Sequence, residues 1–208
     1  KGQYPPGSTF KPLGALIALD EGLITPNFGY NCYGSYGACG DPRKCEHHNA
    51  GHAANLQLAL AYSCNSYFLQ VFRMAIDNPK YKSAKGGYLK WKEYMNAFGF
   101  GRKLGVDLPS ENKANIPDTA QYNKDFGNPR YWNSCYMLTL GIGQDRMTAT
   151  PLQLANSMAF IANSGYYYTP HFVDSIENET EEEAEQLAPF RTKQKVTKIP
   201  KEYFDVIK

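Results

Sequence analysis

Long apolar runs are missing from this sequence. No stretch approaches the roughly 18 consecutive apolar residues of a membrane-spanning helix, and no leader with a charged start and an apolar centre opens the chain. An excess of one charge is missing too: 22 basic residues stand against 20 acidic ones, so a nucleic-acid partner is not expected. What remains is a chain of 208 residues, long enough for one domain with a buried core.

We expect both ends of the sequence to be internal to a longer chain. Lys1 stands where a complete protein has its initiator Met. At the other end, Tyr203, Val206 and Ile207 have helical spacing behind Pro200, a residue that suits a first helical turn. No Gly or Asn ends this pattern, which predicts that the sequence stops inside a helix.

Apolar periodicity predicts three helices, over residues 13–23, 55–76 and 150–161. The second is apolar almost all round, which indicates burial on more than one face. The third begins with a capping box formed by Thr150 and Gln153.

Four other segments have different signatures. Residues 166–176 alternate enough for a strand. The basic stretch 80–92 is expected to be solvated surface, and the acidic stretch 177–186 a surface loop. Residues 27–55 show no period, and a segment of that length is usually functional or held by a crosslink.

The pattern Ser-x-x-Lys occurs twice, and its context separates the two copies. Ser110 and Lys113 follow a Leu-Pro pair in a polar segment that leads into no predicted helix. Ser8 and Lys11 immediately precede the helix expected at 13–23. Residues three apart share a helix face, so Lys11 can reach the Ser8 hydroxyl. We therefore interpret Ser8 as a nucleophile and Lys11 as its base.

This placement suits base catalysis by a lysine. A free lysine titrates near ~10.4 and is a poor base at neutral pH. Burial and the positive end of a helix both favour the neutral amine. Pro12 has no N–H, so the Ser8 carbonyl lacks its usual helical partner and the opening turn is expected to be loosened.

Ser63-Cys64-Asn65 places small polar residues inside a long apolar helical stretch. Buried hydroxyls and amides need hydrogen-bond partners. One interpretation is local bonding within a helix. The other is functional, with Ser63 relaying a proton and Asn65 holding a substrate amide.

Several segments together resemble the class B penicillin-binding proteins, and the resemblance covers essentially the whole chain. They are residues 4–12, 63–68, 104–111, 141–144, 150–155 and 161–165. The Gly51-His52 segment is most similar to the elongation-type subgroup that serves rod-shape growth. The implied fold is α+β, penicillin-binding/serine β-lactamase-like, with an antiparallel sheet flanked by helices and its C-terminal part missing.

The resemblance implies a peptidoglycan D,D-transpeptidase. Ser8 attacks the penultimate D-alanyl carbonyl of a stem peptide with Lys11 as base, and terminal D-alanine leaves with help from Ser63. An amine from a second stem peptide then resolves the acyl-enzyme, with Asn65 in the site. A β-lactam acylates Ser8 by mimicking the first peptide. The Ser8 N–H supplies half of the oxyanion hole.

The family's third motif, Lys-Thr/Ser-Gly, is absent from these residues. Residues 1–208 are therefore read as a transpeptidase-domain fragment that begins just before Ser-x-x-Lys and ends before the third motif. We expect the fragment to be inactive and the full-length protein to be an enzyme. A β-lactam-hydrolysing or β-lactam-sensing relative and a non-enzymatic, metal-stapled scaffold remain alternatives.

Cysteine and histidine are clustered. Seven of the nine fall between Cys32 and Cys64, and thiolate with imidazole suits a structural zinc site. The resemblance to some elongation-type relatives implies that the ligands are Cys32, Cys45, His52 and Cys64. The metal would hold segment 27–55 in place. The acyl transfer itself is expected to need no cofactor.

Other assignments of these side chains stay open. His47 or His48 can replace one of the four ligands. A disulfide such as Cys32–Cys45 is the competing interpretation. Cys39 and Cys135 are expected to be spare thiols.

The resemblance also implies partners and a place in the cell. The partners are peptidoglycan stem peptides, β-lactam antibiotics, a membrane glycosyltransferase and the elongation machinery. The place is the periplasmic side, at the outer face of the cytoplasmic membrane, with an anchor upstream of this chain.

Overall fold

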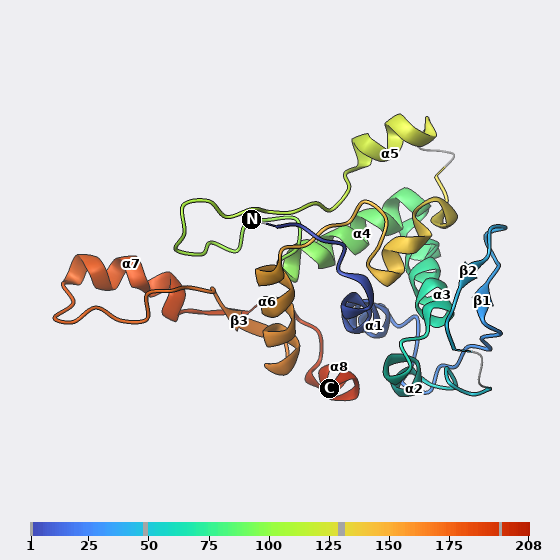
Figure 1. Ribbon diagram of the computed structural model, residues 1–208, viewed down its shortest axis with the longest axis horizontal. Coiled ribbons are helices and arrows are strands. Elements are labelled where there is room, and N and C mark those ends of the chain that lie inside the picture. The colour runs from blue at the N-terminus through green and yellow to red at the C-terminus, as the bar shows by residue number, and fades with distance from the viewer. Residues whose placement is uncertain (1, 48–49, 129–131, 196) are drawn as a thin grey trace.

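The computed structural model describes residues 2–47, 50–128, 132–195 and 197–208 (Figure 1). Its elements, with 3-10 helices labelled η, run in the order η1 (Gly7–Phe10), α1 (Lys11–Asp20), β1 (Ser35–Tyr36), β2 (Arg43–Lys44), α2 (Leu56–Ala61), α3 (Asn65–Ile76), η2 (Pro79–Tyr81), α4 (Ala84–Ala97), α5 (Thr119–Phe126), η4 (Ser134–Ile142), α6 (Pro151–Ala162), β3 (Tyr166–Tyr168), α7 (Glu181–Arg191), β4 (Lys193–Lys195) and α8 (Lys201–Ile207). Within the described ranges, every helix is too short or too polar to cross a lipid bilayer.

Helix α3 packs against α1, α4 and η4, in the half of the molecule that also holds β1 and β2 (Figure 1). Strands pair antiparallel in two small sheets, β1 with β2 and β3 with β4. This mixture of helices and antiparallel strands confirms the α+β class. The helix expected at 13–23 is α1, and the capping box of Thr150 and Gln153 opens α6 as predicted.

The predicted helix over 55–76 is interrupted. Helix α2 ends in a Schellman motif, in which the Ser63 N–H donates to Leu60 O (3.0 Å) and the Cys64 N–H to Ala59 O (2.9 Å). Ser63 itself has φ of 50°, in the left-handed region. Helix α3 then restarts at Asn65 with Cys64 as its N-cap. The apolar pattern continues across the break because both helices pack on the same core.

The prediction of a solvated stretch at 80–92 was wrong. This stretch contributes most of α4, and Tyr88 and Trp91 on its inner face are 0% and 2% exposed. Trp91 packs against Tyr88 and Phe72 with ring centroids 5.7 Å apart in each pair. Lys85, Lys90 and Lys92 of the same helix are only partly buried, and this basic composition concealed a helical period.

Two further expectations fail near the C-terminal side. The strand at 166–176 ends at Tyr168; beyond it, the N–H groups of Phe172 and Val173 donate to the Asp107 carboxylate rather than to a strand.

The acidic stretch expected as a surface loop contains the start of α7. A capping box of Thr180 and Glu183 begins this helix, because a carboxylate satisfies N–H groups and the dipole at a helix start.

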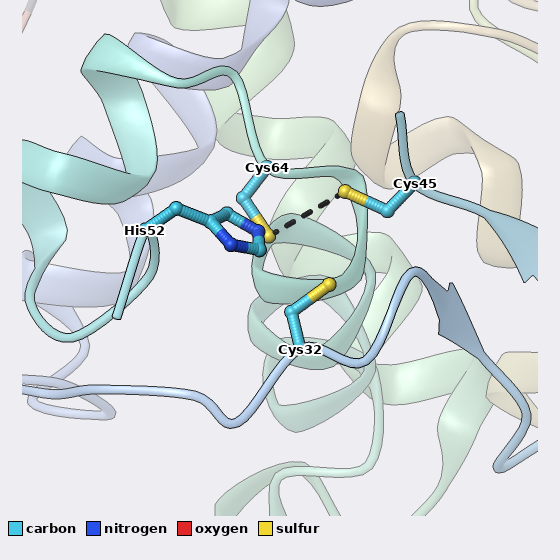
Figure 2. A group of neighbouring side chains, drawn as sticks. All are labelled: Cys32, Cys45, His52 and Cys64. Atoms are coloured by element: carbon cyan, nitrogen blue, oxygen red, sulfur yellow. Dashed lines mark hydrogen bonds between the residues drawn. The ribbon is translucent and has the colours of Figure 1, made fainter. Parts of the chain in front are cut away.

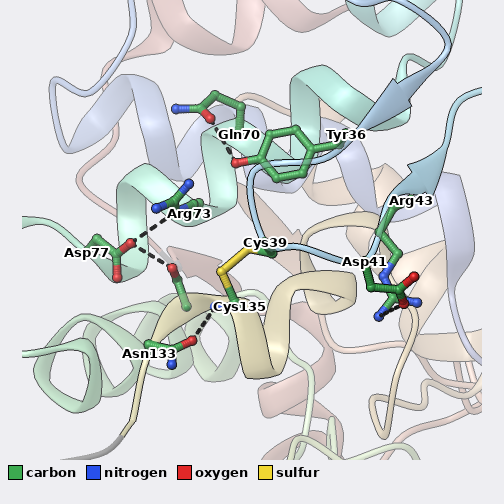
Figure 3. Close-up of a disulfide and its surroundings, with 10 residues drawn as sticks. Tyr36, Cys39, Asp41, Arg43, Gln70, Arg73, Asp77, Asn133 and Cys135 are labelled. Atoms are coloured by element: carbon green, nitrogen blue, oxygen red, sulfur yellow. Dashed lines mark hydrogen bonds and ion pairs between the residues drawn. A yellow bond between two sulfur atoms is a disulfide. The ribbon is translucent and has the colours of Figure 1, made fainter.

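Cys39 and Cys135 are not spare thiols, because they form a disulfide with Cα atoms 5.4 Å apart (Figure 3). The bond joins the segment between β1 and β2 to the first turn of η4 across 96 residues of sequence. Between β1 and α3, Tyr36 adds a hydrogen bond from its hydroxyl to Gln70 Oε1 (2.9 Å). The aperiodic segment is therefore attached to the helical core at more than one point.

Candidate active site and cysteine cluster

Ser8 lies in the 3-10 turn η1, directly before α1. The Lys11 N–H donates to Ser8 O, three residues back, because Pro12 has no N–H to make the four-residue bond. The loosened turn predicted from Pro12 thus takes the form of a 3-10 turn. Gly7 holds it from the other side: its φ is 58° and its N–H donates to Gly143 O at 2.8 Å.

The Lys11 amine joins the predicted catalytic residues from two segments of the chain. Its Nζ lies 3.1 Å from Ser8 Oγ, 2.8 Å from Ser63 Oγ and 2.7 Å from Asn65 Oδ1. A fourth oxygen, the Ser63 carbonyl, accepts from it at 2.6 Å. The structure thus brings together all four residues named from the two motifs, although they lie more than 50 positions apart in sequence.

The electrostatics of Lys11 favour a base near neutral pH. The residue is 1% exposed, and this burial lowers the pKa of Lys11 to about 8 against the opposing charges of Cys45, Cys64 and Glu46. The Lys11 ammonium has only three hydrogens to donate to the four surrounding oxygens. The neutral Lys11 amine has a lone pair and can accept the Ser8 proton. The arrangement therefore allows proton transfer from Ser8 to Lys11.

Asn65 connects this site to the segment around β2. Its Oδ1 accepts from Lys11, while its Nδ2 donates to Lys44 O at 3.1 Å. Ser63 is placed by the Schellman motif, which turns its hydroxyl to the lysine. The break between α2 and α3 is therefore what delivers both side chains to Ser8.

A pocket opens in front of the nucleophile. Its lining residues are Ser8, Glu46, His47, Ser63, Asn65, Ile142 and Gln144. Glu46 was not predicted as a site residue from the sequence. The only sequence feature that distinguishes Glu46 is its position next to Cys45. Ser110, from the other Ser-x-x-Lys copy, lines a separate groove with Leu108 and Phe172.

A second cluster lies directly behind the break. Cys32, Cys45, His52 and Cys64 are all buried, and one ligand atom from each lies within 4.8 Å of the others (Figure 2). Cys45 Sγ and Cys64 Sγ are 3.8 Å apart. Tetrahedral zinc–thiolate bonds of about 2.3 Å place two sulfurs ~3.8 Å apart, so this donor set fits a closed structural site.

The protonation of the thiols is uneven. Burial opposes ionisation of Cys45, but backbone N–H groups, first that of His47, hold the pKa of Cys45 at about 6. Burial raises the pKa of Cys64, and the neighbouring thiols add to this. Without a cation, the negative charge of the cluster therefore lies on Cys45, and a divalent cation bound there would offset it and favour ionisation of Cys64 as well.

The alternatives for this cluster have different outcomes. Cys32, Cys45 and Cys64 are free thiols, so the disulfide of the structure is not the Cys32–Cys45 pair. The His47 ring faces His52 with centroids 5.8 Å apart, and His47 also lines the Ser8 pocket. His48 lies outside the described residues.

Comparison with known proteins agrees with this geometry. Residues 1–205 match the model of the penicillin binding protein transpeptidase domain. The peptidoglycan D,D-transpeptidase MrdA of Haemophilus influenzae is 33% identical over 180 residues, which cover 85% of this chain and 26% of the relative. The chain therefore spans about a quarter of that relative's length.

Two solved structures have the same fold. PBP2 of Pseudomonas aeruginosa, in complex with WCK 5153, has a TM-score of 0.76 at 27% identity and covers all of this chain and 43% of its own. PBP2 of Helicobacter pylori, in a complex with MreC, has a TM-score of 0.68 at 26% identity, over 91% of this chain and 34% of its own.

Proposed function

Since the chain belongs to the penicillin-binding protein transpeptidase family, we propose that the full-length protein is a peptidoglycan D,D-transpeptidase of the elongation type. The observation that carries this proposal is the buried Lys11 amine, within hydrogen-bond distance of Ser8, Ser63 and Asn65. A nucleophile, a base and a relay within reach of one another are the parts that acyl transfer needs.

The chemistry follows from these contacts. Lys11 takes the Ser8 proton as Ser8 Oγ attacks the penultimate D-alanyl carbonyl, and the Ser8 N–H stabilises the oxyanion. The proton passes through Ser63 to the departing D-alanine amine, because Ser63 Oγ lies 2.8 Å from Lys11 Nζ. Asn65, held by Lys44 O, positions the acyl chain. An amine then attacks the ester and gives a proton to Lys11, which returns it to Ser8 Oγ as the C–O bond breaks.

The test is intact-mass measurement of the full-length protein after incubation with a penicillin. We expect one adduct on the unchanged protein and none on Ser8→Ala. An adduct of the same size on Ser8→Ala contradicts the assignment of the nucleophile. Rapid loss of the adduct by hydrolysis would instead indicate a β-lactam-hydrolysing relative.

We also propose a structural zinc ion bound by Cys32, Cys45, His52 and Cys64. Its support is the enclosed set of three sulfurs and one imidazole within 4.8 Å. Zinc there stabilises the packing of segment 27–55 on the break that carries Ser63 and Asn65. Metal analysis of the purified protein is expected to find one zinc per chain, and absence of metal with the three thiols still reduced contradicts the proposal.

Partners and location are proposed from the relatives. We propose that the protein acts on stem peptides at the outer face of the cytoplasmic membrane, held by a segment beyond these residues. The Helicobacter relative was solved with MreC, which supports a partner from the elongation machinery. Pull-down of the tagged full-length protein from its own cells, followed by mass spectrometry, tests this; recovery of division proteins alone contradicts it.

A further inference from the structure

The pocket in front of Ser8 contains one acidic side chain that the mechanism above does not use. Glu46 lines it together with Ser8, Ser63, Asn65 and Gln144. Apart from Glu46 and His47, the lining residues are Ser, Asn, Ile and Gln, none of which carries a charge at neutral pH. Glu46 is therefore the one acidic side chain among the lining residues, and the buried Lys11 amine lies behind Ser8.

The Glu46 carboxylate is exposed and not neutralised. Among the ion pairs of the described ranges, none includes it. Asp41, on the same segment, is paired with Arg43 at 3.2 Å. The Glu46 charge also reaches the catalytic lysine, on which it acts to raise the pKa. A charge left unpaired beside a nucleophile is available to a cationic ligand.

The backbone that leads into Glu46 is held by hydrogen bonds. Lys44 O accepts from Asn65 Nδ2 at 3.1 Å, and the Cys45 N–H donates to Gly34 O at 2.8 Å. Cys45 is buried in the cysteine cluster. These contacts fix the chain just before Glu46, whose side chain lines the pocket in the absence of any ligand.

We propose that Glu46 binds the primary ammonium group of the acceptor substrate, the second strand that resolves the Ser8 acyl-enzyme. The inference rests on the proposed transpeptidase function and names the residue that selects the second substrate. A carboxylate repels the donor's terminal carboxylate and that of a β-lactam. The Glu46 side of the pocket therefore suits the cation and not the donor.

The step balances as follows. The ammonium loses one proton to solvent, and the neutral amine attacks the ester carbonyl. The new C–N bond forms as the C–O bond to Ser8 breaks. The attacking nitrogen gives its second proton to Lys11, which returns it to Ser8 Oγ. Glu46 exchanges no proton and serves only to raise the local amine concentration and to aim it.

The experiment uses full-length protein and a D-alanyl thioester donor whose acyl-enzyme partitions between water and an added amine. The amine is glycinamide, a primary ammonium without a carboxylate. For Glu46→Gln we expect the ratio of aminolysis to hydrolysis to fall about 5- to 10-fold, as expected for loss of one partly exposed charge-assisted contact. Hydroxylamine, which is uncharged at neutral pH, should resolve both proteins equally.

The matched control is Asp41→Asn, which removes the same charge from the same segment outside the pocket. It should leave the ratio unchanged. An equal fall with Asp41→Asn, or an equal fall with hydroxylamine, overturns the inference. So does normal acylation of Glu46→Gln with an unchanged glycinamide ratio, while the proposed function stands. If the unchanged protein is not acylated at all, the proposed function fails and this inference fails with it.

Discussion

At the residue scale, Ser63 combines an unfavourable backbone with a catalytic position. Its φ of 50° closes helix α2 and aims its hydroxyl at Lys11. A left-handed conformation costs an L-residue about 1–2 kcal/mol, a cost that glycine does not carry. In the proposed mechanism this position needs a hydroxyl to relay the proton, which glycine does not have.

Comparison of Ser63→Gly with Ser63→Ala separates the two roles. We expect the free energy of unfolding of Ser63→Gly to exceed that of Ser63→Ala by about 1 kcal/mol, because Gly relieves the left-handed strain. Both variants should acylate slowly, since neither has the hydroxyl. Urea unfolding and penicillin labelling measure the two effects, and equal stability of the variants would contradict the strain argument.

The pH dependence of acylation reports on Lys11. Burial lowers the pKa of this amine to about 8, and in the proposed mechanism the neutral amine is the base. The acylation rate should therefore rise as pH increases through about 8 and reach a plateau above it. Lys11→Ala should be slower by about 10²–10⁴-fold and lack this rise. Stopped-flow acylation with a chromogenic β-lactam tests both, and an identical rise in the variant contradicts the assignment.

At the element scale, the disulfide joins the β1–β2 region to η4 (Figure 3). Replacing Cys39 and Cys135 by Ser together should lower the free energy of unfolding by about 2–4 kcal/mol, because a long loop is released in the unfolded chain. In chelator and denaturant without reductant, we expect three free thiols per chain, rising to five after reduction. One free thiol before reduction would show that a second disulfide exists.

The elements also show which structure can be read from sequence. Capping boxes and helical periods predicted α1 and α6 because these signals are local. The break at Ser63 and the burial of α4 could not be predicted, because tertiary packing decides which face of an apolar or basic segment is covered. The Cys39–Cys135 pair was missed for the same reason, since 96 residues separate its members.

At the scale of the whole molecule, the active site is formed by parts far apart in sequence. Ser8, Lys11, Ser63 and Asn65 were predicted as a set because two short motifs carry them, and the structure brings them together. Glu46 was not predicted, because a single acid in a loop carries no motif. Only the fold places it at the pocket.

A polypeptide of residues 1–208 alone should label slowly with fluorescent penicillin. The sequence has no Lys-Thr/Ser-Gly motif, so these residues lack the second oxyanion donor that the family places there. Loss of one such donor costs about 10²–10³-fold in rate. Labelling should be compared with that of the full-length protein at equal concentration. Equal rates would show that the motif is dispensable for acylation.

The two cysteines of the disulfide are synthesised at different times. Cys39 leaves the ribosome 96 residues before Cys135, which at about 5–20 residues per second is a wait of roughly 5–20 s. During that interval Cys32 and Cys45 are the nearest thiols to Cys39, so premature pairing among the three competes with the native bond. In the folded structure Cys32 and Cys45 are buried against α3, where they are withdrawn from Cys39. We therefore expect the native bond to form with fewest errors when the cysteine cluster closes before Cys39 meets Cys135.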